Sequence, residues 1–548
     1  MGLRSWLVEK VAGDIIDNKV NSQLNVFRYE VPGKELMLPR LAMFRQQEYK
    51  IWAEGNPADL IKFYGMYSLV PGEMETGSRQ LFWEWVKGIN NVPKLHYPAP
   101  EIIMNQMKSL IFADDLDVSV VVKGDKADDD GNYKEDEKAS REMTTELLNI
   151  LKENDSNEKY QTGCLMETYS GSLSFRPVYN DEVSEYPIIL PYPAEKIGLR
   201  SKLGKIYEVI YNDEYKVDKK RYRLKSHYGK GYIRYVLWLC DSGGNEKQQV
   251  PLETVEELRE GYDDIIITLD GKEPIPLLLA PFKKNRTKSN EFMDTEYGGS
   301  DFQGITDLFH MIDELYSQKN LYIRRARPMI TLSDRFLQKD SAGKEKIPKE
   351  YEQDTIVIRG DEGTNNLNKP ERDLPDLNLT PYDDSIKDEL KNAWLKIGLS
   401  YTTVGLEANS ANASGVSLEI KERSTIIVRS NKIKLWDSFL QRTYQILMIF
   451  NSLKDAQVTK EDGVTTYKIN NLFDYDYNIE FPVYNNQSFD EKLDEAIKAR
   501  NGGIFDTKAA VDHALKNTYT EDQKAEIVKN SKIENGTPLI GDELGEVE

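Results

Sequence analysis

Apolar residues in the first part of the chain recur mainly at helical spacing, three or four positions apart. This periodicity predicts a series of helices, at residues 3–15, 38–55, 78–89, 98–112 and 141–154. Residues 117–122 alternate between apolar and polar side chains instead, which predicts a strand. From residue 170 to Pro281 the alternation continues in short segments broken by Gly, Asp and Asn, so we expect strands that pair as antiparallel hairpins.

The helical pattern returns after this β-rich region. Residues 298–327 predict a helix that Ser300 or Asp301 caps and that Pro328 ends. At helical spacing its expected buried face consists of Ile305, Leu308, Ile312, Leu315 and Lys319.

A short β-like segment separates this helix from a second one. Met329–Leu332 and Thr355–Arg359 alternate and predict two strands. The second helix follows Pro381, and Asp383 and Asp384 suit the positive end of its dipole. Its expected buried face consists of Ile386, Leu390, Trp394 and Ile397.

A loop of small and polar residues, Gly398–Ser414, leads from the second helix into a much longer one. From Ser414 to Phe450 the chain has no proline and a single glycine, and apolar residues recur at helical spacing. At about 1.5 Å per residue, a helix of roughly 40 residues would be about 60 Å long. A strand-like return at 477–485 follows, and Asn501–Gly503 divides the helical end of the chain.

Composition, charge and cysteine content restrict the possible classes of protein. The 548 residues are 39% hydrophobic and 30% charged, which is typical of a folded protein. The formal net charge of −20 argues against a protein that binds bulk DNA tightly, but not against one through which DNA passes.

No apolar run approaches the roughly 20 residues of a membrane span. Cys164 and Cys240 form no C-x-x-C motif, so we expect a reduced cytoplasmic chain with neither a disulfide framework nor a zinc site.

Catalytic motifs do not emerge from the sequence. The four histidines form no H-E-x-x-H or other metal-binding spacing, and there is no G-x-S-x-G elbow. His310 lies within the first predicted helix of the second half and is interpreted as a packing or surface residue. Acidic pairs such as Asp263-Asp264 are common in a chain with 92 carboxylates and usually mark solvated turns. We therefore expect no enzyme activity, no metal and no cofactor.

The order of these segments resembles the portal proteins of long-tailed double-stranded DNA bacteriophages. The resemblance covers roughly Pro98 to Leu515 and is best in "GGSDFQGITDLFHMIDELYSQKNLYIRRARPMI". Three further segments resemble other parts of the family. The wing entry resembles "APEIIMNQMKSLIFADDLDVSV", and the tunnel region resembles "LKIGLSYTTVGLEANSANASGVSLEI". The crown resembles "FDEKLDEAIKARNGGIFDTKAAVDHAL". The acidic insertion around 128–138 has no counterpart in the family pattern.

The resemblance implies an α+β portal fold with wing, stem, clip and crown that assembles into a ring. The implied parts are a wing at 1–297, a first stem helix at 298–327, a clip at 328–380, a second stem helix at 381–398, a tunnel loop at 399–414, a long tunnel helix at 415–453, wing return strands at 454–485, and a crown with C-terminal tail at 486–548.

The family also implies a location and a set of partners. Its members form rings, usually dodecamers, at one capsid vertex, and double-stranded DNA is packaged and ejected through the channel. The portal itself hydrolyses nothing. The implied partners are other copies of the chain, the DNA, the terminase large subunit, a head-tail adaptor protein, and the major capsid and scaffolding proteins. The implied location is the virion, with assembly in the bacterial host cytoplasm and no membrane.

The small-residue loop is the expected DNA-facing segment. Its candidate residues are Glu407, Asn409, Ser410, Asn412 and Ser414, with Lys421 just inside the long helix. Short, mostly uncharged side chains can touch a moving duplex without neutralising its phosphates, which would add affinity and slow sliding. An ordinary connecting loop remains an alternative, as do salt bridges between subunits for Lys421 and Arg423.

The short strands between the stem helices are the expected docking segment. Strands this short do not form a core alone, which favours pairing with a neighbouring subunit. Lys344, Lys346, Lys349 and Arg359 are the candidate contacts to a motor or adaptor. A solvent-exposed hairpin would have the same sequence pattern. Two further functions also stay open: a nucleic-acid-processing enzyme subunit, and another virion protein such as a minor head or baseplate component.

Overall fold

The computed structural model describes most of the chain and divides it into two compact units. The described residues are 40–67, 82–83, 93–127, 133–241, 244–258, 262–271, 273–285, 296–326, 329–333, 336–339, 343, 345–347, 355–358, 371–373, 377–400, 415–461, 463–482, 493, 496–500, 506–515, 524 and 527–529. The first unit comprises 1–410 with 421–482, and the second comprises 411–420 with 483–548. The first predicted helix, 3–15, lies outside the described residues.

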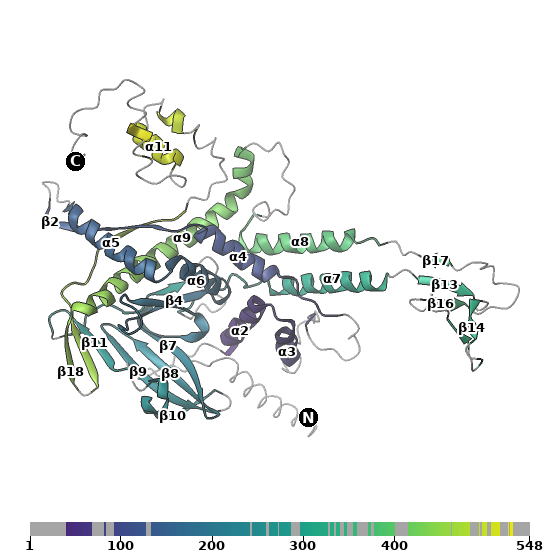
Figure 1. Ribbon diagram of the computed structural model, residues 1–548, viewed down its shortest axis with the longest axis horizontal. Helices are drawn as coiled ribbons and strands as arrows, with labels where there is room; N and C mark the ends of the chain where they lie inside the picture. Colours follow the sequence, from purple (N-terminus) through teal and green to yellow (C-terminus); the bar gives the residue numbers. More distant parts are fainter. Residues whose placement is uncertain are drawn as a thin grey trace. The chain divides into compact units, whose positions relative to one another are not determined.

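The first unit is a mixed α+β structure with several sheets (Figure 1). Its first helices are α2 (Arg40–Glu54), α3 (Pro57–Tyr67), α4 (Ala99–Phe112), α5 (Glu137–Glu153) and α6 (Ser156–Ser170). Three of the helices expected from periodicity, 38–55, 98–112 and 141–154, are thus confirmed as α2, α4 and α5. The side chain of Asp136 caps α5 by accepting from the backbone N–H groups of Lys138 and Ala139.

The β-rich region forms one large sheet and smaller ones. The order in the large sheet is β18-β19-β11-β9-β8-β7-β6, with β10 added to β9. These strands are β6 (Ile197–Lys202), β7 (Lys205–Val217), β8 (Lys220–Tyr228), β9 (Tyr232–Cys240), β10 (Glu246–Val250), β11 (Asp264–Thr268), β18 (Gln457–Glu461) and β19 (Val464–Lys468). The smaller sheets include β12-β4-β5, from Phe282–Lys284, Ser172–Val178 and Ile188–Pro193, and the pair of β1 (Asp117–Val121) with β20 (Asp476–Glu480).

One strand pair departs from the antiparallel hairpins that the sequence predicts. β6 to β9 pair antiparallel with their sequence neighbours, as expected, but β11 and β19 run parallel. Asp264 is paired with Val464, so the two strands come from segments far apart in the chain. The β18–β19 hairpin arrives after the long helix and adds itself to the sheet edge. A pattern that links adjacent strands cannot detect such a pairing.

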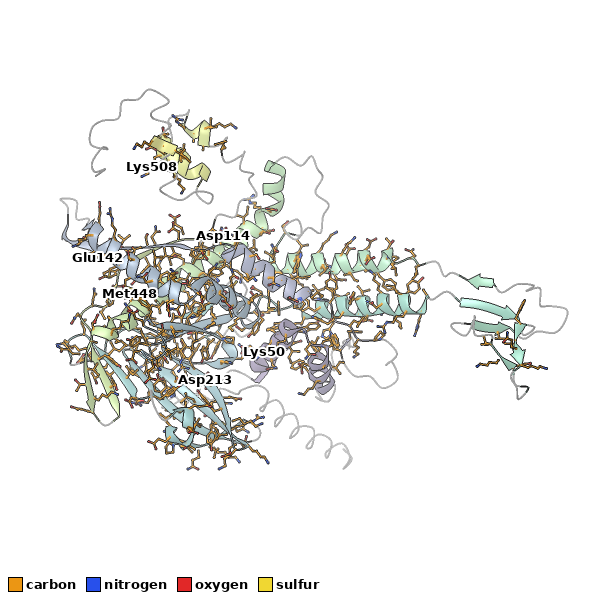
Figure 2. All side chains as sticks on the ribbon, in the orientation of Figure 1. Lys50, Asp114, Glu142, Asp213, Met448 and Lys508 are labelled. Atoms are coloured by element: carbon orange, nitrogen blue, oxygen red, sulfur yellow. The ribbon has the colours of Figure 1, made fainter. Side chains whose placement is uncertain are left out.

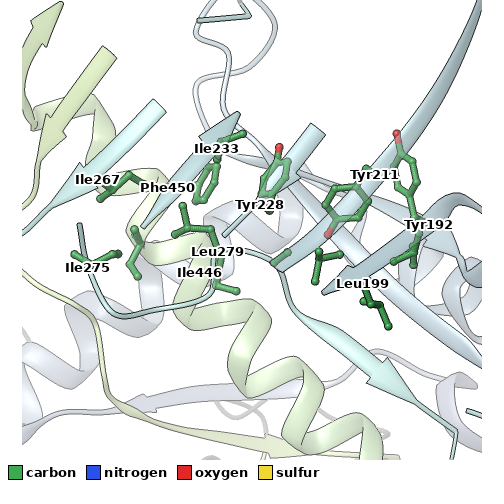
Figure 3. Close-up of a cluster of buried hydrophobic side chains, with 14 of the residues drawn as sticks. Tyr192, Leu199, Tyr211, Tyr228, Ile233, Ile267, Ile275, Leu279, Ile446 and Phe450 are labelled. Carbon is green, nitrogen blue, oxygen red and sulfur yellow. The ribbon is translucent and has the colours of Figure 1, made fainter. Parts of the chain in front are cut away.

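The main hydrophobic core lies between the large sheet and the end of the long helix α9 (Gly415–Asn451). The sheet contributes Leu199, Tyr211, Tyr228, Ile233 and Ile267, and α9 contributes Ile446, Ile449 and Phe450 (Figure 3). Every residue of α9 from Thr443 to Phe450 is buried, including Met448, which lies in the dense interior (Figure 2). The burial of so many large apolar side chains fixes this end of α9 against the sheet.

The second unit contains helical segments. Residues 496–500 are helical, and α11 spans Thr507–Leu515. The Asp506 side chain accepts from the backbone N–H of Ala509 at 2.6 Å and thereby caps α11. Two helices flanking Asn501–Gly503 agree with the sequence pattern, while the glycine turn lies outside the described residues.

Candidate functional site

The second half of the first unit contains two helices joined by a small β segment. Helices α7 (Thr306–Arg325) and α8 (Thr380–Ile397) lie side by side and run in opposite directions (Figure 1). Lys319 of α7 pairs with Asp383 of α8, with Nζ and Oδ1 2.5 Å apart, and the rings of Tyr322 and Tyr382 stack with centroids 6.1 Å apart. These contacts fix the register of the pair.

Helix α7 begins later than the sequence predicts. Neither Ser300 nor Asp301 caps it, because both have other partners. The Ser300 hydroxyl accepts from the backbone N–H of Phe302 and donates to the carbonyl of Thr168, while Asp301 pairs with Lys432. The helix therefore starts at Thr306, and no side chain caps it.

Two glycines bring the segment before α7 against the end of α6. Gly171 ends α6 with a φ of 74°, and a Cβ there would lie 2.5 Å from the carbonyl oxygen of Gly298. A Cβ on Gly298 would in turn lie 2.2 Å from the Gly171 oxygen. Only glycine permits this approach, which positions Asp301 beside α6.

The buried face of α7 is also broader and more polar than predicted. Ile305 and Ile312 are buried as expected, whereas Leu308, Leu315 and Lys319 are only partly buried. The additional buried residues are Phe309, His310, Asp313 and Ser317. The expected face was right at Ile305 and Ile312 but incomplete, because α7 is covered on two sides, by α8 and by the segments 40–67 and 93–97.

Asp313 lies at the centre of the contact between α7 and the segments 82–83 and 93–97. Its carboxylate accepts from the indole of Trp83 at 2.9 Å and from the backbone N–H of Tyr97 at 2.7 Å, and it lies 2.9 Å from His96 Nδ1. Burial raises the pKa of Asp313, and these hydrogen bonds oppose the rise. The Ser317 hydroxyl accepts from the N–H of Leu95 one turn later. Asp313 precedes Glu314 in a helix that also contains Asp307, so its sequence context gives no signal that it is buried.

His310 packs between aromatic side chains rather than facing a substrate. Its ring lies 4.4 Å from that of Tyr64 and 5.0 Å from that of Trp52, edge to face in both cases. Burial, with a smaller contribution from Lys94, lowers the pKa of His310 to about 3. His310 is therefore neutral at physiological pH, in agreement with its interpretation as a packing residue.

Helix α8 follows the sequence prediction closely. Asp383 lies in its first turn, and Ile386, Leu390, Trp394 and Ile397 are all buried. Gly398 ends the helix with a φ of 82°, and a Cβ there would lie 2.8 Å from Cγ2 of Val428 in α9. The N–H of Ser400 donates to the Thr425 hydroxyl at 2.8 Å, which ties the start of the following segment to α9.

The long helix is confirmed as α9, with 37 residues and a length of about 55 Å at 1.5 Å per residue. In its middle, Lys432 lies in a buried ion cluster with Asp301, Glu167 and Lys283. Lys432 Nζ lies 2.7 Å from Asp301 Oδ2 and 3.8 Å from Glu167 Oε1, and Lys283 pairs with the same Glu167 oxygen. All four side chains are at most 2% exposed.

This buried ion cluster joins four separate segments: α6, β12, the approach to α7, and α9. Its two cations and two carboxylates balance, as buried charges must. Burial lowers the pKa of Lys283, which also lies 4.8 Å from the Trp436 ring centre. Burial alone would lower the pKa of Lys432 too, but Asp301 and Glu167 raise it above its ordinary value. Sequence reasoning missed the cluster, although a lysine four residues before Trp436 on the buried side of α9 was a usable signal.

The segment between α7 and α8 contains the expected strands. β13 (Met329–Ser333) and β16 (Thr355–Ile358) confirm both predicted strands and pair in parallel, and β17 (Glu371–Asp373) joins β13 antiparallel. A further hairpin consists of β14 (Gln338–Lys339) and β15 (Glu345–Lys346). We call 329–373 the β insert.

Most of the residues predicted to act in the channel or in docking cannot be placed. Two groups lie outside the described residues: the predicted channel residues Glu407, Asn409, Ser410, Asn412 and Ser414, and the predicted docking residues Lys344, Lys349 and Arg359. Lys421 is in α9, but its side chain is not described. Lys346 is exposed on β15, and Arg423 is exposed on α9. Of the predicted docking and channel residues, the structure therefore places only the side chain of Lys346.

In the described part of the chain, neither the two cysteines nor any group of possible metal ligands forms a site. There, no three His, Cys, Asp or Glu side chains gather in a way that could hold a metal ion. Cys164 and Cys240 are free and buried, and burial raises the pKa of Cys164 to about 12. Among the described helices, none is long and apolar enough to cross a membrane.

Removing one charge from the buried ion cluster should destabilise the protein more than removing a pair. We expect Asp301→Asn to lower the free energy of unfolding by about 3–5 kcal/mol, because Lys432 would remain buried without its closest partner. The double variant Asp301→Asn with Lys432→Met should recover much of that loss. Lys138→Ala, in an exposed ion pair, should change stability by less than about 1 kcal/mol. Denaturant titration of the wild-type protein and these three variants measures the free energy of unfolding. Equal losses of this free energy in the single Asp301 variant and the double variant would contradict the prediction.

The buried His310 should make the protein acid-sensitive. Its pKa is lowered from 6.5 to about 3 on folding, so the unfolded chain binds the extra proton first. Its stabilising contribution is therefore complete above about pH 6.5 and is lost as the pH falls toward 3, by about 1.4 kcal/mol per pH unit. His310→Phe keeps an aromatic ring without a titrating group. Stability measured from pH 7 to pH 4 should fall less steeply in this variant, and parallel curves would contradict the assignment.

A comparison with known proteins finds no matching protein family and no matching curated relative.

Proposed function

We propose that this chain is the portal subunit of a double-stranded DNA bacteriophage, which forms a ring around a channel for DNA. The observation that carries the proposal is the arrangement of α7, the β insert, α8 and α9. Two antiparallel helices lead to a small β segment and back, and a long helix then returns to the core of the first unit. This arrangement matches the stem, clip and tunnel helix that the sequence resemblance implies.

The β insert supports assembly with other copies. Its sheet has three strands of three to five residues each. Such short strands are marginal on their own and need a packing partner. Neighbouring copies of the same insert in a ring would supply that partner. In this proposal the terminase large subunit, and later a head-tail adaptor protein, bind the ring at the β insert.

The outward face of α8 is a second argument for contacts between copies. Opposite its buried residues it carries Asp384, Asp388 and Leu395, all exposed, and Leu395 is 56% exposed. Side chains along α7 and α8 project outward as well as between the two helices (Figure 2). On α9, Ile426 and Ile427 are 37% and 51% exposed near the residues that contact the end of α8. Apolar side chains on such a face favour association.

Charge indicates which surface meets this face. Arg324 and Arg325, at the end of α7, are exposed, and within the described residues neither pairs with a carboxylate. Arg324 points away from α8, because five residues of helix separate it from Lys319, which faces α8. The α7 end of one copy can therefore approach Asp384 and Asp388 of the next. Such a head-to-tail contact closes into a ring when the rotation between copies permits.

The acidic character of the chain agrees with transport rather than retention of DNA. The net charge of −20 disfavours tight retention of phosphates, whose neutralisation would slow the duplex. We propose that the 399–414 loop faces the DNA, that capsid and scaffolding proteins surround the first unit outside the stem, and that the ring resides at the capsid vertex of the virion. No enzymatic step is part of this proposal.

Imaging of the purified protein tests the assembly. Negative-stain electron microscopy should show rings with a central hole at least as wide as a DNA duplex. Light scattering should give a mass near twelve copies of the chain. Closed dimers with metal-dependent nuclease activity would contradict the proposal and favour a nucleic-acid-processing enzyme instead.

A single charge on the outward face of α8 should prevent ring formation without unfolding the subunit. Leu395→Asp places a carboxylate in the proposed contact, and its exposure means that the fold should tolerate it. Val183→Asp, at a residue 70% exposed and far from α8 in sequence, is the matched control. Size-exclusion chromatography and circular dichroism should show folded, smaller species only for the first variant. Rings of normal size from Leu395→Asp would exclude this face from the interface.

A further inference from the structure

The large sheet carries a polar pocket on the face opposite its hydrophobic core. Strand pairing brings its residues together: Arg200 is opposite Glu208, and His227 is opposite Arg234. The pocket has a volume of about 400 Å³, and Lys225 and Trp238 also line it. This volume falls within the range of small-molecule sites, about 300–1,000 Å³. The pocket is remote from α7, α8 and the β insert in sequence, and the proposed channel does not use it.

Ion pairs lie in and beside this pocket. Glu208, 3% exposed, is 2.9 Å from both His227 Nδ1 and Arg200 Nη1. Glu246, 9% exposed, accepts from Lys225 at 2.7 Å and from Arg223 at 3.2 Å. Arg223 also pairs with Glu214 at 3.0 Å, so the cations and carboxylates on this face of the sheet are matched in ion pairs.

One of these donors still has capacity for another acceptor. Arg200 Nε is buried without a hydrogen-bond partner among the described residues. His227 Nδ1 lies 2.9 Å from Glu208 Oε1 and donates to this carboxylate, so Nε2 of the neutral ring is an acceptor and not a donor. Burial would raise the pKa of Glu208, but the hydrogen bond from His227 and the charge of Arg200 lower it overall, so this carboxylate stays ionised and cannot donate.

Two further residues line the pocket: Arg234, an exposed cation, and Trp238, an aromatic side chain. Arg234 is 67% exposed, and its pairing with Asp264 at 3.2 Å is solvent-accessible. Exposed pairs of this kind contribute little, so Arg234 can turn toward a ligand at small cost. Trp238 presents its ring beside Lys225, whose Nζ lies 5.6 Å from the ring centre. A guanidinium suits the planar, two-oxygen geometry of carboxylate and phosphate groups.

We propose that this pocket binds a small ligand bearing carboxylate or phosphate groups, whose oxygens accept from Arg200 and Arg234. The anion supplies an acceptor for Arg200 Nε, which has none among the described residues. The proposal is independent of the assembly proposed above, because every residue in it belongs to one chain.

Calorimetric titration of the full-length protein tests the site, with citrate, inorganic phosphate and a short glutamate-rich peptide as separate probes. At least one probe should bind saturably and more weakly as salt is raised. Binding of citrate alone, of phosphate alone or of the peptide identifies the source of the oxyanion. The absence of saturable binding by all three would overturn the proposal.

Three variants locate the binding in this pocket. Arg200→Gln and Arg234→Gln should each weaken binding by about tenfold, because each removes a charge-assisted hydrogen bond. Glu208→Gln should strengthen it, because one competing acceptor charge is lost. Lys284→Gln removes a cation of similar exposure, 18% against 20% for Arg200, from an ion pair in β12 outside the pocket, and should leave binding unchanged. Arg234 is on the rim, so its variant should fold even if Arg200→Gln does not. Equal affinity in Arg234→Gln and the Lys284→Gln control would contradict the assignment.

Discussion

The buried contact between Lys432 and Asp301 is the constraint on which the arrangement of the first unit depends. A lysine in the middle of a 37-residue helix is tolerated in the interior only because two carboxylates from other segments reach it. Those carboxylates come from α6 and from the approach to α7. The charge requirement therefore fixes where the long helix passes, and where the α7–α8 pair leaves the body of the unit.

The two halves of α9 serve different purposes around this point. Toward its end, from Thr443 to Phe450, the helix is buried on all sides and packs under the large sheet through Ile446, Ile449 and Phe450. Before Lys432, the helix contacts the end of α8 through Thr425 and Val428, while Ile426 and Ile427 remain exposed. The same helix thus connects the buried core to a surface with exposed apolar side chains.

Local patterns predicted the elements well wherever one partner covers one face. Helix α8 is an example, because Ile386, Leu390, Trp394 and Ile397 all face inward. For α7 the predicted helix is present and Ile312 is buried, but covering on two sides also brings Asp313 and His310 into the interior. The parallel pairing of β11 with β19 and the cluster around Lys432 join segments far apart in the chain, and no periodicity of a single segment encodes such partners. The candidate site was predictable as an order of elements, while its proposed DNA-facing loop lies outside the described residues.

Chemical crosslinking between copies tests the central claim, ring assembly through α7 and α8, most directly. Cysteines introduced at Arg324 and Asp384 would be exposed, whereas Cys164 and Cys240 are buried and should not react. A short bismaleimide should then produce a ladder of covalent multimers whose largest member gives the number of subunits, and neither single variant should produce a ladder beyond dimers. A doubly substituted protein that forms native-sized particles but yields no ladder would contradict the account.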